Sequence, residues 1–303
     1  MEQINIYNKQ ITAHCSDLYK ILDPIGSGSY GEVFLAEDKN KNKYAAKIEE
    51  KKKLKKSKSR LKDEYKIYLR LEKNNKNNCL GIPKIYGIYD SPDYIILIME
   101  LLGYNLDHKF ESLDKQFKLC TTFKIAIDSI NLLKQVHKSG IVHRDIKPGN
   151  FLLNLKGDIL FIMDFGLSKQ YIYNKNKHIE FKSDKNLIGT PRFASLNIHM
   201  GFEPSRRDDL ESIAYMLIYF AKGVLPWQGL KKDKKISQFS KICEVKLCTD
   251  ITELCKDLPE CFNIYLKYCR NLKFEETPNY QYILKLFTDD CIKLDITPKY
   301  EWL

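Results

Sequence analysis

The sequence predicts an α+β fold with two lobes, a small β-rich N-terminal lobe with one main helix and a larger α-helical C-terminal lobe. Strand-like runs separated by turn residues fill the N-terminal third, whereas apolar residues recur at helical spacing in the remainder. The 303 residues, 44% of them apolar, are enough to bury a sizeable core. We expect a single domain over residues 1–303, with an N-terminal lobe at about 19–102, a hinge at about 100–104 and a C-terminal lobe at about 105–303.

The expected elements follow in chain order. Strand-like runs in the N-terminal lobe lie at 19–25, 31–37, 43–49, 85–89 and 94–99. One helix is expected there over 61–72, where Leu61, Tyr65 and Tyr68 recur at helical spacing. Further helices are expected at 121–137, 208–222, 262–271 and 280–290. The run 208–222 is strongly apolar, which predicts a buried central helix.

The chain is basic, with a formal net charge of +11 from 50 basic and 39 acidic residues. A basic balance favours nucleic acid, anionic lipid or acidic protein segments as partners and selects none of them. The lysine run within 51–58 is expected to be a solvated helix face or loop, with a localisation or nucleic-acid patch as the alternative.

The nine cysteines have no common zinc-site spacing, so we expect reduced and mostly buried thiols, as in a reducing compartment. No signal peptide is visible at the N-terminus, and no apolar run is long enough to span a bilayer. We therefore expect a soluble intracellular protein without membrane insertion. A cytoplasmic location is expected, and entry into the nucleus stays open.

The first motif that carries chemistry is Gly-Ser-Gly-Ser-Tyr-Gly-Glu-Val at 26–33. Its glycines let the backbone approach phosphate groups without clashes from Cβ atoms. Alone, this motif could be a dinucleotide fingerprint or a plain glycine turn. A Rossmann site would require a helix next. Instead a second strand-like run and Ala-Ala-Lys at 45–47 follow, so the segment resembles the glycine loop and strand lysine of protein kinases.

Lys47 would pair with the α and β phosphates, and it needs a carboxylate to hold its ammonium group in place. Glu64 is the expected partner, because it shares a helical face with Leu61 and Tyr68 and because the resemblance to protein kinases implies a glutamate in this helix. A surface position for Glu64 is the alternative interpretation, and Glu72 is a rival partner.

The second motif, His-Arg-Asp-Ile-Lys-Pro-Gly-Asn at 143–150, matches the catalytic loop of protein kinases. Asp145 would accept or orient the proton of the substrate hydroxyl group. Lys147 would neutralise charge on the transferred phosphoryl group, and Asn150 would hold a metal ion. These residue types suit phosphoryl transfer, which needs positioning and charge neutralisation more than covalent help.

The third motif, Asp-Phe-Gly at 164–166, follows an apolar run at 159–163. Asp164 would bind the magnesium ion that bridges the β and γ phosphates. The three motifs in this order predict a protein kinase. A degenerate, inactive kinase is the main alternative, and every catalytic position argues against it.

The segment 189–197 resembles the region after the activation loop in casein kinase 1 enzymes, with Ser-Leu-Asn at 195–197 where most kinases carry Ala-Pro-Glu. Segments 99–103, 147–152, 205–212 and 225–230 are also close to that family's pattern. The resemblance runs from about Tyr19 to Trp302 and implies a two-lobed protein serine/threonine kinase. It also implies ATP and Mg²⁺ as cofactors, with Mn²⁺ as an alternative ion.

The same resemblance places ATP between the lobes, with Met99 as gatekeeper and the backbone of Glu100 and Leu102 bonded to adenine. It identifies Asp209 as the acid that braces the catalytic loop backbone. The expected ATP-binding residues are Ile25, Gly26, Ser27, Gly28, Ser29, Tyr30, Gly31, Val33, Ala45, Lys47, Met99, Glu100, Leu102 and Leu152.

Casein kinase 1 enzymes favour serine or threonine shortly after an acidic or phosphorylated residue, so acidic or phosphorylated proteins are the expected substrates. Arg144, Lys169 and Lys185 match an anion site of that family, and such cations bind phosphate well. Arg192 matches a second basic position near the substrate groove. Gln238 stands where the family has a lysine, which weakens the expectation that a phosphorylated substrate is required.

Three other functions were weighed. A catalytically silent ATP-binding scaffold is disfavoured by the intact motif residues, and a vaccinia-related kinase is the alternative within the enzyme class. No segment resembles a nucleic-acid-binding module, so no specific nucleic acid is expected despite the charge. We expect a monomer.

Overall fold

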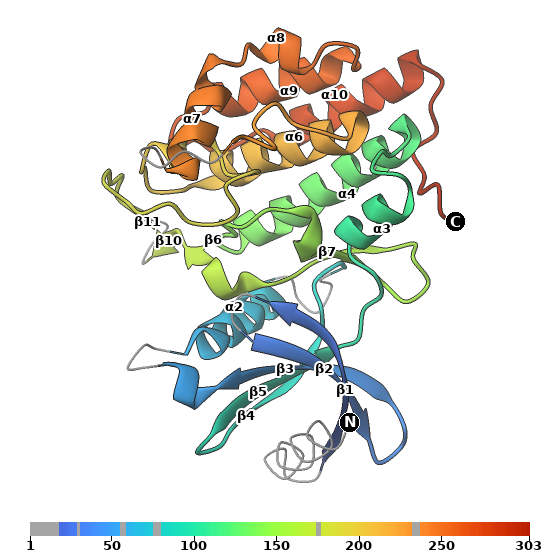
Figure 1. Cartoon of the computed structure of the whole chain (residues 1–303), viewed down its shortest axis with the longest axis vertical. Coiled ribbons are helices and arrows are strands. Elements are labelled where there is room, and N and C mark those ends of the chain that lie inside the picture. Colours follow the sequence, from blue (N-terminus) through green and yellow to red (C-terminus); the bar gives the residue numbers. More distant parts are fainter. Residues whose placement is uncertain (1–17, 29–30, 55–58, 75–79, 174–176, 232–236) are drawn as a thin grey trace.

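The structure is a computed structural model that describes residues 18–28, 31–54, 59–74, 80–173, 177–231 and 237–303. Figure 1 shows the predicted two lobes, with a sheet in blue to cyan below a group of green to red helices. The N-terminal lobe is a five-stranded antiparallel sheet of order β1-β2-β3-β5-β4. Its strands are β1 (Tyr19–Gly28), β2 (Gly31–Asp38), β3 (Lys43–Glu50), β4 (Ile85–Asp90) and β5 (Tyr94–Glu100). All five predicted strands are confirmed.

The two faces of this sheet have different roles, because successive side chains of a strand point to opposite faces. Ala46 and Ile48 of β3 belong to a small apolar cluster on one face. Ala45 belongs to the main core on the other face, together with Leu97 and Met99 of β5. Lys47 has the same parity as Ala45, so the strand turns its lysine inward toward the rest of the molecule.

Helix α2 (Arg60–Asn74) packs on the inward face and confirms the helix predicted at 61–72. Its buried residues, Leu61, Glu64, Tyr68 and Leu71, recur at spacings of three and four, which form one side of an α-helix. A glutamate therefore sits on the buried side of an otherwise apolar stripe.

The end of α2 is also tied to the C-terminal lobe. Arg70 Nε and Asn74 Nδ2 both donate to the carbonyl oxygen of Ser139, at 2.8 and 3.3 Å. Ser139 follows the last residue of α4 (Leu119–Lys138), a long helix of the C-terminal lobe. These bonds fix the position of α2 relative to that lobe.

The C-terminal lobe is built around α6 (Arg206–Lys222), most of whose side chains are buried, as predicted for the central helix. The helix begins after Ser205, whose N–H donates to Asp208 Oδ2 at 2.7 Å, and it ends at Gly223, which has a φ of 81°. Helices α4, α9 (Glu260–Asn271) and α10 (Tyr280–Lys293) are confirmed as well.

Several shorter elements were not predicted. The short helices are α3 (Leu106–Ser112), α5 (Leu196–His199), α7 (Gln238–Cys248) and α8 (Ile251–Leu254). The paired strands are β6 (Ile141–Val142) with β9 (Lys169–Gln170), β7 (Phe151–Leu153) with β8 (Leu160–Ile162), and β10 (Ile172–Tyr173) with β11 (Lys177–His178). The single-turn 3-10 helices are η1 (Lys51–Leu54), η2 (Pro148–Asn150) and η3 (Phe165–Leu167). The β6–β9 and β7–β8 pairs frame the loops that carry residues 143–150 and 163–166.

The lysine run begins on η1, where Lys51 forms an ion pair of 2.6 Å with Asp90, and its later lysines (55, 56 and 58) lie outside the described residues. The seven described cysteines are free thiols, and Cys255, Cys261, Cys269 and Cys291 are buried. None of the described helices combines the length and apolar character needed to cross a bilayer.

The β2–β3 pair yields a stability test. A Cβ atom at Gly31 would lie 2.3 Å from the carbonyl oxygen of Ile48, whereas one at Gly26 would meet no atom within 4 Å. We expect Gly31→Ala to lower the free energy of unfolding by about 1–3 kcal/mol, because backbone must shift, while Gly26→Ala changes it by less than about 1 kcal/mol. Urea unfolding of both variants and the unchanged chain measures this. Equal stability of the two variants would contradict the close approach at Gly31.

Candidate active site

The candidate site lies where strand β3, helix α2 and two loops of the C-terminal lobe meet. Lys47 comes from the middle of β3 and Glu64 from α2. The loop after β6 supplies residues 143–150, and the loop after β8 supplies Asp164. Elements from both lobes are therefore needed to assemble one polar cluster.

Lys47 bridges two carboxylates at the centre of the cluster. Its Nζ atom donates to Glu64 Oε2 at 2.7 Å and to Asp164 Oδ1 at 2.8 Å. The side chains of Lys47 and Glu64 are 6% and 2% exposed, and that of Asp164 is 20% exposed. Glu64, rather than the exposed Glu72, is thus the partner of Lys47.

Burial and charge set the protonation of this cluster. Burial alone would lower the pKa of the Lys47 ammonium group, but Glu64 and Asp164 together raise it above its ordinary value. Burial would raise the pKa of Asp164, and the nearby Lys47 charge instead holds it below its ordinary value. Lys47 therefore stays a cation and Asp164 an anion, as binding of a polyphosphate and a metal ion would require. Burial raises the pKa of Glu64, and Lys47 opposes that shift.

The glycine-rich segment forms the end of the β1–β2 hairpin. Gly26, Ser27 and Gly28 are the last residues of β1, and Gly28 pairs with Gly31. Ser29 and Tyr30 of the predicted ATP site lie outside the described residues. Because a Cβ atom at Gly26 would meet nothing, the backbone there borders open space.

The predicted adenine residues come from both lobes. Val33 and Ala45 lie on the same side of the sheet as Lys47, and Met99 pairs with Ala45 across β3 and β5. Ile25 is exposed, and Leu102 and Leu152 are half-buried. The N–H group of Glu100 donates to the carbonyl of Lys84 at 2.8 Å, so this N–H group is already bonded within the protein.

Asp145 is the centre of the second polar group. Its Oδ2 atom accepts from Lys147 Nζ at 2.7 Å, and its Oδ1 atom accepts from Thr190 Oγ1 at 2.8 Å. Asn150 Nδ2 donates to the Asp145 carbonyl at 2.8 Å, which fixes the loop against itself. The carboxylate is 7% exposed and is held in one orientation from both sides.

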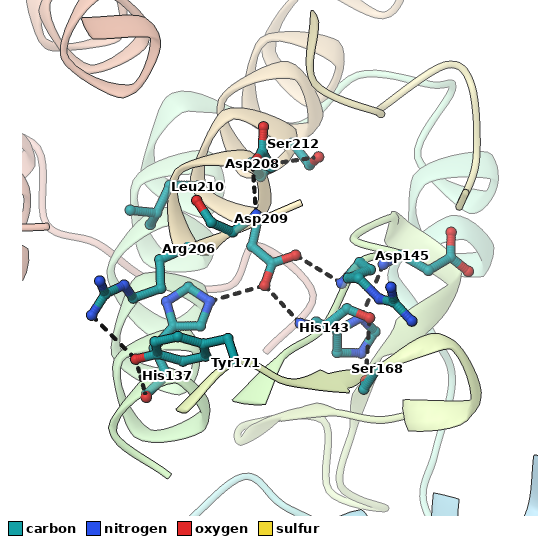
Figure 2. A network of polar contacts seen from close by, with 12 residues as sticks. His137, His143, Asp145, Ser168, Tyr171, Arg206, Asp208, Asp209, Leu210 and Ser212 are labelled. Atoms are coloured by element: carbon teal, nitrogen blue, oxygen red, sulfur yellow. Dashed lines mark hydrogen bonds and ion pairs between the residues drawn. The ribbon is translucent and has the colours of Figure 1, made fainter. Parts of the chain in front are cut away.

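Asp209 of α6 holds the backbone of the same loop, as Figure 2 shows. Its Oδ2 atom accepts from the His143 N–H at 2.7 Å, and its Oδ1 atom accepts from the Arg144 N–H at 2.8 Å. Arg144 has a φ of 69°, a left-handed conformation that costs a residue other than glycine about 1–3 kcal/mol. The two bonds from Asp209 offset this strain.

His137 of α4 also forms a hydrogen bond with Asp209. Its Nε2 atom lies 2.9 Å from Asp209 Oδ2, and its Nδ1 atom lies 2.6 Å from the hydroxyl oxygen of Tyr280. Burial lowers the pKa of His137, so the ring is neutral. A neutral ring donates from Nε2 to Asp209 and accepts at Nδ1 from Tyr280. Three helices, α4, α6 and α10, are thereby joined behind the loop.

Asp164 also has a left-handed conformation, with a φ of 65°. The next residue, Phe165, is 1% exposed and packs its ring edge-on against Tyr68 at 5.1 Å between centroids. It also contacts the ring of His143, at 5.0 Å. The buried phenyl ring anchors the turn, which aims the Asp164 carboxylate at Lys47.

The oxygen atoms near Asp164 and Asn150 suit a magnesium ion. Lys47 donates to Asp164 Oδ1, and Asn150 uses its side-chain nitrogen to donate to Asp145. The other two side-chain oxygens, Asp164 Oδ2 and Asn150 Oδ1, are of the hard oxygen type that Mg²⁺ prefers as a ligand. Within the part of the chain that the structure describes, three or more His, Cys, Asp or Glu side chains nowhere gather as a metal site. A site with two protein ligands fits Mg²⁺, which keeps waters and takes further oxygens from phosphates.

The cations predicted to bind an anion surround an internal carboxylate. Glu203, which is 3% exposed, lies 2.8 Å from Lys169 Nζ, 3.8 Å from Arg144 Nη1 and 3.8 Å from Lys185 Nζ. Three positive charges against one negative charge leave a local excess of two. Arg192 lies elsewhere, exposed, with its guanidinium group over the rings of Phe193 and Tyr219.

Sequence reasoning missed two contacts of these groups. The motifs of the sequence indicate neither the bond from Thr190 to Asp145 nor the position of Glu203 among the cations. Thr190 lies 45 positions from Asp145 and Glu203 lies 34 positions from Lys169, so no local spacing indicates either contact.

Comparison with protein families agrees with this geometry. The model of the protein kinase domain matches residues 19–297, which cover most of the chain. The matched region begins with β1 and includes every residue of the polar clusters described above.

The contribution of the Asp209 hydrogen bonds to the free energy of unfolding can be measured. We expect Asp209→Ala to lower the free energy of unfolding by about 3–5 kcal/mol, because three buried donors lose their acceptor. Asp209→Asn should cost less, since the amide oxygen still accepts from one of them. Chemical unfolding followed by circular dichroism measures both, with Asp289→Asn, an exposed change on α10, as the control. A loss under about 1 kcal/mol in Asp209→Ala would show that the loop does not depend on this carboxylate.

Proposed function

The chain belongs to the protein kinase family, and we propose that it is a serine/threonine kinase of casein kinase 1 type that phosphorylates acidic or pre-phosphorylated protein segments. The observation that carries the proposal is the bridge from Lys47 to both Glu64 and Asp164, opposite an oriented Asp145. The charged groups that we assign to phosphoryl transfer, Lys47, Glu64, Asp145 and Asp164, each contact a partner side chain. This completeness favours an active kinase over a silent ATP-binding scaffold.

In this proposal Lys47 binds the α and β phosphates of ATP. Glu64 keeps the ammonium group pointing into the site, and the open backbone at Gly26 lets the glycine-rich hairpin cover the phosphates. Ala45 and Met99 offer an apolar surface for adenine on the same face. Asn150 and Asp164 would hold Mg²⁺, which neutralises charge on the phosphates when bound.

Asp145 is the proposed acceptor of the hydroxyl proton. Its contacts with Lys147 and Thr190 hold the carboxylate in place before substrate arrives, which is the preorganisation that efficient proton transfer needs. Lys147 lies next to Asp145 and supplies positive charge for the phosphoryl group in transit. Thr190 lies 2.8 Å from Asp145 Oδ1, so we infer that the segment after Thr190 borders the protein substrate.

The preference for acidic substrates rests on the charges near Glu203. The side chains of Lys169 and Lys185 are 32% and 43% exposed, so both can meet a second anion besides Glu203. We propose that a phosphate or carboxylate of the substrate binds there. Because Glu203 already balances part of this charge, the catalytic loop would not need a phosphorylated activation segment to hold Arg144. A soluble monomer in the cytoplasm, with the nucleus as an open alternative, completes the proposal.

Transfer of phosphate from ATP to casein and to an acidic serine peptide tests the enzyme proposal. We expect Asp145→Asn and Asp164→Asn to lower kcat by about 10²- to 10⁴-fold, because each removes a charge that acts in the transition state. Circular dichroism should show an unchanged fold, and Asp289→Asn should retain full activity. Full activity in Asp164→Asn would disprove the residue assignments. Absence of transfer by the unchanged chain, with ATP still bound, would favour the scaffold.

A pair of peptides tests the substrate preference. One carries phosphoserine three residues before the target serine, and the other carries alanine there. We expect kcat/KM for the phosphorylated peptide to be about tenfold higher, as a charge-assisted hydrogen bond implies. Lys185→Met should reduce this ratio, whereas Lys293→Met, an exposed change on α10, should not. Equal rates on both peptides would leave a kinase but remove this preference.

A further inference from the structure

A lysine without exposed surface lies under the segment that follows Thr190. Lys246, on the inner side of α7, is 0% exposed. Its Nζ atom donates to the carbonyl oxygens of Pro191 at 2.9 Å and Ala194 at 2.6 Å. Burying an ammonium group is costly unless its hydrogens are bonded, so the site is specific for this side chain.

Two aromatic rings and an imidazole ring surround the Lys246 ammonium group. Its Nζ atom lies 4.7 Å from the ring centre of Tyr215 and 5.0 Å from that of Trp227. Ring faces attract a positive charge, and the attraction grows when water is excluded. The third neighbour is His199 Nε2, at 3.3 Å, and this nitrogen also lies 3.1 Å from the carbonyl oxygen of Pro191. Because a carbonyl oxygen only accepts, a neutral His199 donates from Nε2 to Pro191.

The residues from Pro191 to Ala194 are thus held from behind at three carbonyl groups. Besides the two bonds from Lys246, the indole N–H of Trp227 donates to the carbonyl of Arg192 at 2.8 Å. At its front end the segment is attached to the catalytic loop, through the bond from Thr190 to Asp145. The stretch that borders the protein substrate therefore takes its shape from α7 and Trp227.

We propose that Lys246 is a positioning residue for the protein substrate, whose charge fixes residues 190–195 in the shape that receives the peptide beside Asp145. The inference rests on the proposed kinase function and goes beyond it. Lys246 would touch neither ATP nor the reacting atoms. Its loss should therefore affect affinity for the peptide and leave affinity for ATP unchanged.

Titration of Lys246 makes this positioning sensitive to pH. Burial lowers the pKa of Lys246 to about 7. Among the groups that face it, Glu211 of α6 and Cys243 of α7 raise the pKa, and Arg270 of α9 lowers it. Burial also lowers the pKa of His199 to about 4, so His199 is neutral above about pH 5 and does not share this titration.

The direction of the pH effect follows from the charge of Lys246. An ammonium group forms charge-assisted hydrogen bonds to the carbonyl oxygens of Pro191 and Ala194 and is attracted to the ring faces, whereas a neutral amine forms weaker bonds and has no charge for the rings. Above about pH 7 the bonds to Pro191 and Ala194 weaken, and the substrate segment loosens. KM for the peptide should rise with pH, while KM for ATP stays level.

The experiment compares the unchanged chain with Lys246→Met, which keeps length and volume, and with Lys267→Met, an exposed lysine of α9. KM and kcat are measured for ATP and for an acidic peptide without phosphate, from about pH 6 to about pH 9. In the unchanged chain and in Lys267→Met we expect peptide KM to rise about 5- to 10-fold over this range. In Lys246→Met it should be high at every pH, with ATP KM unchanged.

Two results would overturn the proposal. One is a peptide KM in Lys246→Met that equals that of the unchanged chain at about pH 6. The other is a parallel loss of ATP affinity, kcat and thermal stability, which would make Lys246 a structural residue only. If Lys246→Met does not fold, the pH series of the unchanged chain decides the question, together with Trp227→Phe. That variant removes the bond to the Arg192 carbonyl and reduces the ring surface that faces Lys246, so it should raise peptide KM without changing ATP KM.

Failure of the kinase proposal is distinguishable from failure of this inference. If the unchanged chain transfers phosphate to no protein or peptide, both proposals fall. If it transfers phosphate with a peptide KM that does not change with pH and does not respond to Lys246→Met, the kinase proposal stands and the role of Lys246 is disproved.

Discussion

The buried carboxylate of Asp209 is the interaction on which the rest of the site depends. It accepts from the backbone N–H groups of His143 and Arg144 and from the ring of His137, so one side chain links two helices to one loop. The loop needs this support because Arg144 is held in a left-handed conformation. With the loop so fixed, Asp145 keeps one orientation, and the adjoining segment at Thr190 has a fixed point of attachment.

Much of the fold could be predicted, because its larger elements have clear local periodicity. The five strands of the sheet and helices such as α2, α4 and α6 were found within a few residues of their observed ends. Strand pairs of two or three residues, such as β6 with β9, are too short for any periodicity to emerge. The short helix α3 starts after Asn105, whose side chain accepts from the His108 N–H. Its seven residues are too few to show a clear helical periodicity in the sequence.

In the candidate site, too, local sequence patterns indicate some contacts and not others. Lys47, Asp145 and Asp164 belong to contiguous motifs, and the pairing of Glu64 with Lys47 follows from helical spacing together with the family resemblance. The contacts of Asp164 with Lys47 and of Thr190 with Asp145 span 117 and 45 positions, so no local pattern indicates them. Lys246 lies 52 positions from its acceptor Ala194, and its place on an inner helix face is one that a pattern would assign to an apolar residue. Such contacts depend on tertiary packing, and a single sequence carries no local trace of them.

The bonds from Arg70 and Asn74 to Ser139 bear on which inhibitors this protein can accept. They fasten the end of α2 to the C-terminal lobe, and Glu64 on the same helix pairs with Lys47. A compound that needs α2 swung outward must first break all three contacts. Its apparent affinity falls by the small fraction of molecules in that state. Compounds that bind the protein with α2 in its observed position do not have this loss of affinity. The search for selective inhibitors of this site should therefore begin with such compounds.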